Sequence, residues 1–178
     1  LGLAWGIPVY QPLSLKDPEM TNLIRKMEPD LMVVISYGKI IPEAIYSIPP
    51  LGTINLHASL LPRYRGASPI QQSLLNGDSK TGISIQKINH RLDEGNLLLS
   101  KEIAIEQEDH YVSLRKKLSE LSAEILKEYL DALKQGKSLP EFPQAGEPSF
   151  CRKITREQGL IRWHEQSAEE VVNQWRAL

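Results

Sequence analysis

Cysteine is almost absent from this sequence, and long apolar runs are missing altogether. Cys151 is the only thiol in 178 residues, which excludes an internal disulfide framework and a zinc site built from clustered thiolates. No apolar run approaches the roughly 20 residues of a membrane helix, and no charged-then-apolar leader opens the chain. These absences indicate a protein of a reducing cytoplasm that has no membrane partner.

An excess of either charge is also lacking. The 21 lysines and arginines balance 22 aspartates and glutamates, so no global positive field attracts a nucleic acid and no acidic tail is present. A polyanion would have to be bound by a local basic patch. With 41% hydrophobic residues, the chain fits one domain that could bury roughly 70% of its unfolded surface. We expect it to act as a monomer.

The first third of the chain alternates between helical and strand patterns. Asp17 followed by proline is typical of a helix start, and it predicts a helix over 18–27. The continuously apolar run at 31–36 predicts a strand that is buried on both faces and central in a parallel sheet. One or two helical turns at 41–47 precede the next strand, at 52–57. Because a strand, a helical crossover and a strand form a parallel pair, this order indicates an α/β fold.

The middle of the chain predicts a helix, a hairpin and a second, longer helix. Ser68 caps the first helix, which Gly77 ends. Strands at 81–89 and 97–105 are joined by so short a loop that they must be antiparallel. An apolar stripe of helical period then runs over 111–135, as in a long helix that packs on a sheet.

A proline-rich stretch leads from this body to a smaller C-terminal unit. Residues 139–148 contain three prolines and a glycine, which favours an extended linker across the surface. Residues 167–170 have the pattern of a capping box. They open a final helix in which Val171, Val172 and Trp175 share a face.

One predicted strand end carries alternating polar side chains. Asn55, His57 and Ser59 stand at every second position where the strand at 52–57 runs into a loop closed by Pro62. Side chains two residues apart on an extended chain point to the same face, so the three can converge on one ligand. His57 is the group suited to move a proton near neutral pH. An isolated Asn-x-His is more often a pair of structural polar residues, so the remaining motifs must decide.

Four segments of the chain, one of which contains the strand end just described, together resemble a known family. They are SYGKIIP at 36–42, NLHASLLPRYRGASPI at 55–70, RLDEG at 91–95 and KITREQGLIRW at 153–163. In this order they resemble the catalytic domain of the methionyl-tRNA formyltransferases, within the 10-formyltetrahydrofolate-dependent formyltransferase family. The resemblance implies an α/β, Rossmann-like formyltransferase fold, with a mostly parallel open sheet, flanking helices and a late antiparallel hairpin.

The resemblance also implies a catalytic trio of Asn55, His57 and Asp93. In the family's reaction an amine attacks the formyl carbon on the folate N10, which creates a tetrahedral oxyanion, and the departing nitrogen then needs a proton. Asn55 would donate to the oxyanion, a contribution of roughly 3 to 4 kcal/mol in acyl transfer. His57, when protonated, would do likewise and act as general acid. Asp93 would hold the imidazole or a water and help deprotonate the incoming ammonium, although an aspartate in Asp-Glu-Gly is also an ordinary turn residue.

The formyl donor that the resemblance implies is 10-formyltetrahydrofolate, bound by three loops without a metal. Main-chain edges can meet the fixed donors and acceptors of a pteridine, and Ile40 and Ile41 would supply apolar walls, with plain core packing as the other interpretation. Ligands of open parallel sheets bind beyond the carboxyl ends of the strands, where Tyr37 and Ser59 lie. The predicted folate-binding residues are Gly38, Lys39, Ile40, Ile41, Ser59, Leu60, Leu61, Pro62, Ile88 and Asn89.

The acceptor implied by the resemblance is the initiator methionyl-tRNA. Arg63 and Arg65 follow the site at once and could bind acceptor-end phosphates, although two surface arginines are usually only a solvated turn. The family's opening strand, its Gly-Thr-Pro loop and its C-terminal barrel have no counterpart here. We therefore expect residues 1–138 to form a catalytic domain without its first strands, and 139–178 to be a linker toward a missing barrel. Such a chain should be inactive or very weak by itself.

Other interpretations stay open. A relative that formylates an amino sugar nucleotide shares the Asn-x-His, Ser-Leu-Leu-Pro and Asp features, although 37–42 and 153–163 favour the tRNA enzymes. A formyltetrahydrofolate hydrolase or dehydrogenase module would use the same trio with water as acceptor. A non-catalytic folate-binding module would keep the fold around a dead site. A hydrolytic pair of Ser59 and His57 is disfavoured, because no Gly-x-Ser-x-Gly turn exposes the serine.

Overall fold

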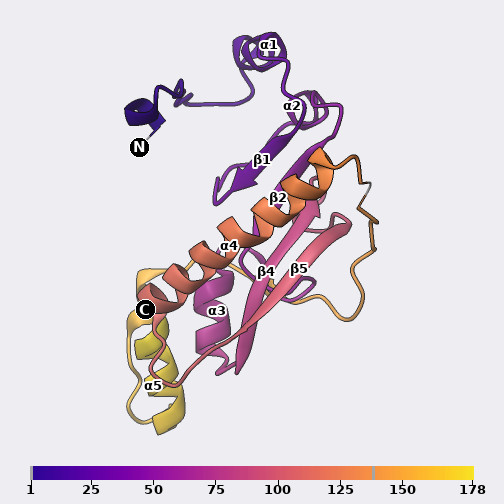
Figure 1. Cartoon of the computed structure of the whole chain (residues 1–178). Helices are drawn as coiled ribbons and strands as arrows, with labels where there is room; N and C mark the ends of the chain where they lie inside the picture. Colours follow the sequence, from indigo (N-terminus) through magenta and orange to yellow (C-terminus); the bar gives the residue numbers. More distant parts are fainter. Residues whose placement is uncertain (1, 138) are drawn as a thin grey trace.

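A four-stranded sheet in the order β1-β2-β4-β5 forms the framework of the molecule (Figure 1). This computed structural model describes residues 2–137 and 139–178. The strands are β1 (Met32–Ile35), β2 (Thr53–His57), β4 (Lys80–Lys87) and β5 (Leu97–Ala104). β1 runs parallel to β2, whereas β4 is antiparallel to both β2 and β5. The α/β fold, the parallel pair and the late antiparallel hairpin are confirmed.

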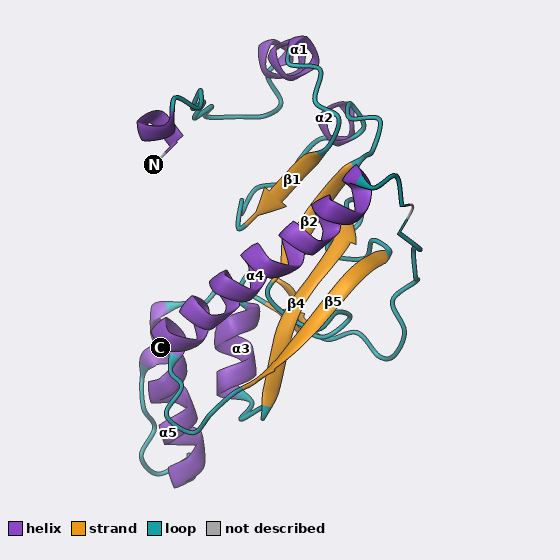
Figure 2. Cartoon of the chain, viewed as in Figure 1, coloured by secondary structure: helices purple, strands orange, loops and turns teal. Residues whose placement is uncertain are grey.

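Helices lie on and around this sheet, as Figure 2 shows. They are α1 (Pro18–Lys26), α2 (Glu43–Tyr46), α3 (Pro69–Leu75), α4 (Tyr111–Lys134) and α5 (Ala168–Ala177), with single turns η1 (Gly2–Trp5) and η2 (Arg156–Gly159). The starts follow local chemistry: the Asp17 carboxylate accepts from the Glu19 amide, and His110 Nδ1 accepts from the Val112 amide. In the described part of the chain, no helix has the length and apolar character that crossing a membrane requires.

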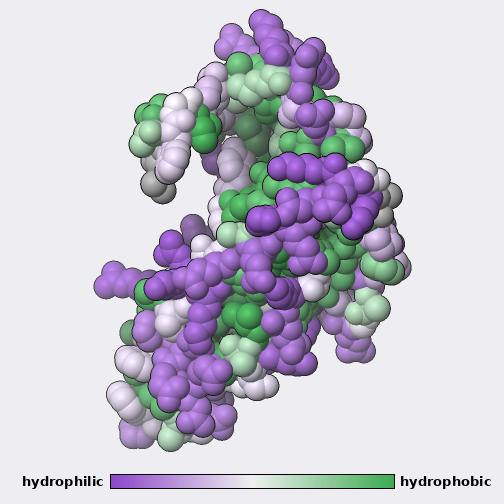
Figure 3. Space-filling view, viewed as in Figure 1, coloured by the Kyte–Doolittle hydropathy of each residue, from purple (hydrophilic) through white to green (hydrophobic). Residues whose placement is uncertain are grey.

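The core lies between α4 and the sheet. Leu114, Leu118 and Ile125 repeat at helical spacing, are almost fully buried, and share one core cluster with Ile83 and Ile85 of β4. Burying each such side chain contributes roughly 1.5 to 3 kcal/mol. The outer face of α4 is largely hydrophilic (Figure 3). The predicted apolar stripe at 111–135 is therefore a core seam that packs the helix on the sheet.

β1 is an edge strand in the described residues. Its side chains are only partly buried, and Ile35 is 52% exposed. The prediction of a central strand buried on both faces is wrong for this chain, because β2 is the single partner of β1 among the described strands. Apolar side chains also line the hollow below α1 (Figure 3), among them Leu23, Met27 and Met32.

Residues 139–178 return to the body instead of leading away from it. β6 (Phe150–Cys151) pairs in parallel with β3 (Arg65–Gly66). α5 packs against α3, and Arg176 donates to the backbone carbonyl oxygen of Asp109 at 2.6 Å. The domain boundary at 138 stays a prediction, but the segment beyond it contributes to the same folded body.

The buried face of α5 contains two polar side chains beside Ala177. The predicted capping box forms between Ser167 and Glu170. The helix then buries Asn173 and Gln174, while Trp175 is 72% exposed. The Gln174 amide can be buried because it donates to the carbonyl oxygens of η2 and its flank. The apolar residues that the sequence places on one face of this helix include Val172 and Trp175, which point to solvent.

Candidate active site

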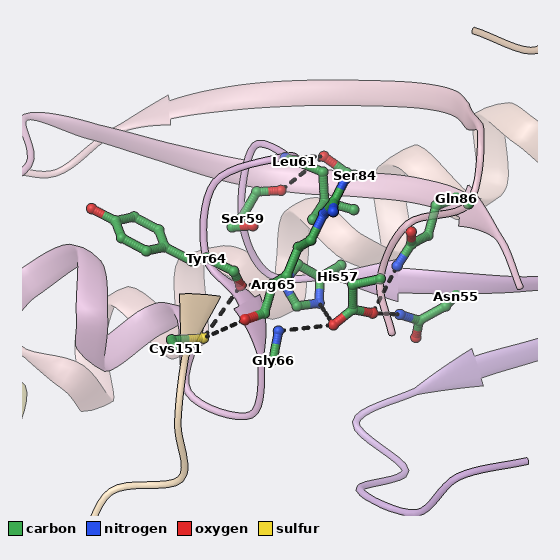
Figure 4. A network of polar contacts seen from close by, with 12 residues as sticks. Asn55, His57, Ser59, Leu61, Tyr64, Arg65, Gly66, Ser84, Gln86 and Cys151 are labelled. Carbon is green, nitrogen blue, oxygen red and sulfur yellow. Dashed lines mark hydrogen bonds and ion pairs between the residues drawn. The ribbon is translucent and has the colours of Figure 1, made fainter. Parts of the chain in front are cut away.

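Polar side chains face one another across β2 and β4. In the strand register Asn55 lies opposite Gln86, and His57 lies opposite Ser84. Directly paired residues project to the same face of a sheet, so these four side chains share one face (Figure 4). The two strands therefore bring a polar cluster to the place where the sequence predicts a site.

Asp93 reaches this cluster from the loop between β4 and β5. Its backbone has φ 51°, in the left-handed region that Asp and Asn enter more readily than most residues. Gly95 follows in the same loop, and a Cβ there would lie 1.6 Å from the Lys87 carbonyl oxygen. Since only glycine fits this close approach, Gly95 lets the loop fold back and bring Asp93 to β2.

The Asp93 carboxylate is the centre of the cluster. Oδ1 accepts from Gln86 Nε2 at 2.8 Å and from Asn55 Nδ2 at 3.4 Å. Oδ2 accepts from the Gly66 backbone N–H at 2.9 Å and lies 3.7 Å from His57 Nδ1. The fold thus brings together all three residues of the sequence-predicted trio.

The two ring nitrogens of His57 have different partners. Nε2 lies 2.8 Å from the backbone carbonyl oxygen of Tyr64. A carbonyl oxygen only accepts, so Nε2 carries a hydrogen whether the ring is neutral or charged. Nδ1 faces Asp93 Oδ2 at 3.7 Å, so it is the nitrogen at which the charged form of the ring would carry its second proton. The ring is 6% exposed, and these two partners set its orientation.

The loop that follows β2 is closed on itself. Ser59 is fully buried, and its hydroxyl donates to the Arg63 carbonyl oxygen. Ser84 Oγ in turn donates to the Ser59 carbonyl oxygen and accepts from the Leu61 amide. Leu61 and Pro62 are buried as well. This part of the predicted folate site is therefore a fixed wall, and Ser59 does not contact His57 as a nucleophile would.

The other predicted folate loops are open. Gly38 has φ 69°, Lys39 Nζ donates to the Leu13 carbonyl oxygen, and Ile40 is 91% exposed. Ile41 and Ile88 are partly buried, and Asn89 is exposed. These residues are accessible to a ligand, but the protein holds them less firmly than the loop at 59–62.

Comparison with known proteins assigns the chain to a family. The sequence profile of the formyl transferase family matches residues 6–130. The chain belongs to the formyl transferase family. It is 42% identical over 178 residues to a methionyl-tRNA formyltransferase of Trichlorobacter lovleyi, a match that covers 100% of this chain and 56% of that protein. The chain thus spans about half the length of the curated relatives that it matches.

Solved structures of formyltransferases share the fold. A 4-N formyltransferase from Francisella tularensis superposes with a TM-score of 0.79 at 18% identity, over 93% of this chain and 66% of that one. HypX from Aquifex aeolicus, solved in complex with tetrahydrofolic acid, gives 0.77 at 18% identity, over 90% and 28%. These neighbours support a Rossmann-like formyltransferase fold.

The two arginines that follow β2, Arg63 and Arg65, have different surroundings. Arg63 is half-exposed, pairs with Asp78 at 2.8 Å and lies over the Tyr64 ring. Arg65 is 9% exposed, and its Nη1 lies 3.0 Å from Glu94 Oε1. Both were assigned to tRNA from the sequence. The geometry favours Arg63 for contact with a large partner, because the Arg65 guanidinium is engaged inside the protein.

Tyr64 and its neighbours form a small network beside Arg63. The phenol donates to Asp78 Oδ2 at 2.6 Å and accepts from Asn76 Nδ2 at 2.9 Å. Burial, followed by the hydrogen bond to Asp78, raises the pKa of Tyr64 above its usual value. Burial likewise raises the pKa of the Cys151 thiol, which donates to the Tyr64 carbonyl oxygen.

Among residues 2–137 and 139–178, no three His, Cys, Asp or Glu side chains gather as metal ligands.

Sequence reasoning missed four groups that hold the trio. The Tyr64 carbonyl and the Gly66 N–H are main-chain atoms, and no residue type announces them. Gly66 is nevertheless required, because a Cβ there would lie 2.2 Å from the Cys151 carbonyl oxygen. Gln86 had a signal: it continues the alternation of Ser84 along β4, opposite Asn55 and His57. Gln144 lies in the linker and has no local signal.

Proposed function

We propose that this protein transfers a formyl group from 10-formyltetrahydrofolate to the amino group of initiator methionyl-tRNA, in translation initiation. The cluster of Asn55, His57 and Asp93 carries the proposal, since it joins an amide donor, an imidazole and a carboxylate within one network. The likeness to methionyl-tRNA formyltransferases supports the choice of acceptor. We also propose that the protein is cytoplasmic and monomeric.

The transfer needs one bond to form and one to break. The amine nitrogen bonds to the formyl carbon, the bond between that carbon and N10 breaks, one proton leaves the amine, and N10 takes up one proton. The carbonyl oxygen carries negative charge in between. No covalent bond to the protein is required, which agrees with the burial of Ser59.

Asn55 supplies the amide donor for the oxyanion. It is partly buried, as Asp93 is, and one of its two N–H bonds is directed to Asp93 over a long 3.4 Å. Among the described residues the second N–H has no hydrogen-bond partner, so it can meet a ligand. Donors of this kind, placed in advance, lower the barrier because no reorganisation is needed when charge develops.

His57 and Asp93 handle the protons. The Tyr64 carbonyl holds the Nε2 hydrogen, so the proton that can move is the one on Nδ1, beside Asp93 Oδ2. In this arrangement the imidazolium stabilises the oxyanion and gives its Nδ1 proton to N10 as it departs, while the carboxylate accepts the proton that the amine loses, so that one proton is given and one is taken. The donor supplies the activated formyl group when bound.

The residues present fit a folate donor. Ile40 is an exposed isoleucine in the open loop, and the loop at 59–62 is held by hydrogen bonds. Main chain at 38–41 and 88–89 is accessible for the edge of a pteridine. We assign the phosphate contact of the tRNA to Arg63, because its side chain is half-exposed.

The proposal is tested by finding which molecule receives the formyl group. Full-length protein with formyl-labelled 10-formyltetrahydrofolate is incubated with methionyl initiator tRNA, with an amino sugar nucleotide, or with no acceptor. The expected result is label on the tRNA alone. Label on the sugar would identify an amino sugar formyltransferase, release of formate without acceptor would identify a hydrolase, and no turnover with folate bound would identify a binding module.

The role of Asn55 is tested by Asn55→Ala in the same assay. We expect kcat to fall about 10² to 10³-fold, because one oxyanion donor is lost. Folate affinity, measured by calorimetry, should change little. Asn22→Ala is the matched control, since Asn22 is an exposed amide on α1. Unchanged kcat in Asn55→Ala would remove Asn55 from the mechanism.

A further inference from the structure

The linker segment that holds Gln144 is fixed to the body on both sides. Leu97 and Phe142 exchange two backbone hydrogen bonds, at 2.7 and 2.9 Å. Further along, β6 pairs with β3, next to the backbone atoms that contact His57 and Asp93. Gln144 lies between these two attachments and beyond the residues that the family profile matches. Its place in the site therefore comes from tertiary contacts.

Both the nitrogen and the oxygen of the Gln144 side-chain amide make hydrogen-bond contacts. Nε2 lies within hydrogen-bond distance of three oxygens: the Asp93 carbonyl at 2.8 Å, the Gly95 carbonyl at 2.9 Å and Gln86 Oε1 at 3.3 Å. Oε1 accepts from Arg65 Nη2 at 2.7 Å and from Arg65 Nε at 3.1 Å. One amide thus connects the loop of Asp93, the strand β4 and the buried Arg65.

These contacts allow a single orientation of the amide. If nitrogen and oxygen were exchanged, an oxygen would face two carbonyl oxygens, and an NH₂ group would face the Arg65 guanidinium, which has no acceptor. The same reasoning fixes Gln86. Its Nε2 donates to Asp93 Oδ1, a carboxylate oxygen that only accepts, which leaves its Oε1 facing Gln144 Nε2 at 3.3 Å.

We propose that Gln144 is a positioning residue for formyl transfer, which orients Gln86 and the Asp93 loop so that the Asp93 carboxylate meets His57 and Asn55. This inference rests on the proposed function for its kinetic effect. Gln144 holds the Asp93 main chain directly and the Asp93 side chain through Gln86. It acts through other groups and has no contact with His57 or Asn55 among the hydrogen bonds of the described residues.

Arg65 anchors the relay from the other side. Its guanidinium pairs with Glu94, the neighbour of Asp93, and donates twice to Gln144. Five N–H groups in a rigid fork suit this double attachment. Arg65 is thereby assigned to the support of the site, whereas its sequence-based interpretation was a phosphate contact.

The expected consequence is a loss of rate without a loss of binding. The His57 to Asp93 distance of 3.7 Å and the Asn55 to Asp93 distance of 3.4 Å leave little tolerance for a shift of the carboxylate. A misplacement of about 1 Å can lower a rate about 10²-fold. Among the described hydrogen bonds, Gln144 does not contact the predicted folate residues at 38–41, 59–62 or 88–89, and its contacts in the last of these loops are to Asp93 and Gly95, so KM should be spared.

The kinetic test uses two variants of the full-length protein. Gln144→Ala removes every contact, while Gln144→Glu keeps the length and the pairing with Arg65 but removes the donors to Asp93, Gly95 and Gln86. We expect kcat to fall about 10 to 10²-fold in both, with KM for folate and tRNA within about twofold of wild type. The control is Gln107→Ala, an exposed glutamine before α4 that should behave as wild type. Wild-type kcat in Gln144→Ala overturns the proposal.

A second readout separates positioning from general stability and does not depend on activity. The ¹⁵N shifts of the His57 ring report which nitrogen is protonated across pH. In Gln144→Ala the pH dependence of Nδ1 should change, because its carboxylate partner is displaced, while Nε2 stays protonated against the Tyr64 carbonyl. Gln107→Ala should leave both signals in place.

The outcomes are distinguishable. If wild-type protein transfers no formyl group, the proposed function fails, and the ring shifts alone decide whether Gln144 positions Asp93. If kcat falls in Gln144→Ala while the ring shifts match wild type, or if the fall follows a lower melting temperature that Gln144→Glu does not share, the role is structural and the proposal is overturned. A double variant with Gln86→Ala should be no slower than the slower single variant, since both act on one carboxylate.

Discussion

β1 and β2 form one parallel pair but differ in burial, because β2 lies inside the sheet and β1 lies at its edge. β2 has a neighbour on each side, so Ile54 is fully buried and even His57 is 6% exposed. β1 pairs only with β2, and Ile35 at its end is 52% exposed. β2 can bury a polar side chain such as His57, because the loops beyond the strands supply its partners, Tyr64 and Asp93. A strand with one partner leaves even apolar side chains in solvent.

This contrast divides the predicted active site, which comprises the catalytic trio and the folate-binding loops. In the half at 55–62 and 93, hydrogen bonds hold the polar side chains of Asn55, His57 and Ser59 in place. The half at 38–41 follows the edge strand, and Ile40 there is 91% exposed. The rigid half suits catalysis, which needs fixed donors. The open half suits entry and binding of a ligand.

We expect the largest effect on kcat from Asp93→Asn, and we compare this variant with Ile40→Ala. Asp93→Asn keeps the shape of the side chain but removes the charge that faces His57, so kcat should fall about 10² to 10⁴-fold. Ile40→Ala removes an apolar wall of the open half, so it should raise the folate KM by at most about tenfold and leave kcat unchanged. Steady-state formylation kinetics of both variants measure the split. A kcat effect of Ile40→Ala equal to that of Asp93→Asn would erase the division.

A smaller effect concerns stability. Ile85→Ala in β4 opens a cavity in the core and should lower the free energy of unfolding by about 2 to 5 kcal/mol. Ile35→Ala at the edge should cost less than about 1 kcal/mol, because half of that side chain is already in water. Urea unfolding followed by circular dichroism compares the two. Equal losses would mean that Ile35 is covered in the protein in solution.

The smallest expected effect tests the network beside Arg63. Tyr64→Phe removes the hydroxyl that contacts Asp78 and Asn76, so it should cost about 1 kcal/mol at neutral pH. The pKa of Tyr64 is raised in the folded state, so its stabilising contribution is present below the usual tyrosine value near 10 and is lost as the pH rises through the raised pKa.

The stability gap between wild type and Tyr64→Phe should therefore narrow above pH 10. Urea midpoints at neutral pH and above pH 10 measure it, and the exposed Tyr10→Phe is the control. A gap that widens with pH would show that the phenolate form is the one favoured by the fold.

Local patterns predicted most of the elements and marked Asn55 and His57 as candidate site residues. The proline after Asp17, the apolar stripe at 111–135 and the capping box at 167–170 each gave the helix that the structure contains. Their signals are short-range, because capping and amphipathic spacing act within a few residues. Asn55 and His57 were visible for the same reason, while Asp93 needed the family resemblance. The apolar face of the last helix was misjudged, because Gln174 found buried partners that the local pattern does not reveal.

By itself, the sequence determined the α/β order, the family and the chemical types at the site, since these depend on residue identity and local spacing. Only the tertiary structure decided that β1 is an edge, that Arg65 is buried, and that Gln144 and the Tyr64 carbonyl hold Asp93 and His57. The physical reason is the range of the interactions. Asp93 and Gln144 are 51 positions apart, and their hydrogen bond exists only once two strand pairings have placed both segments on one face.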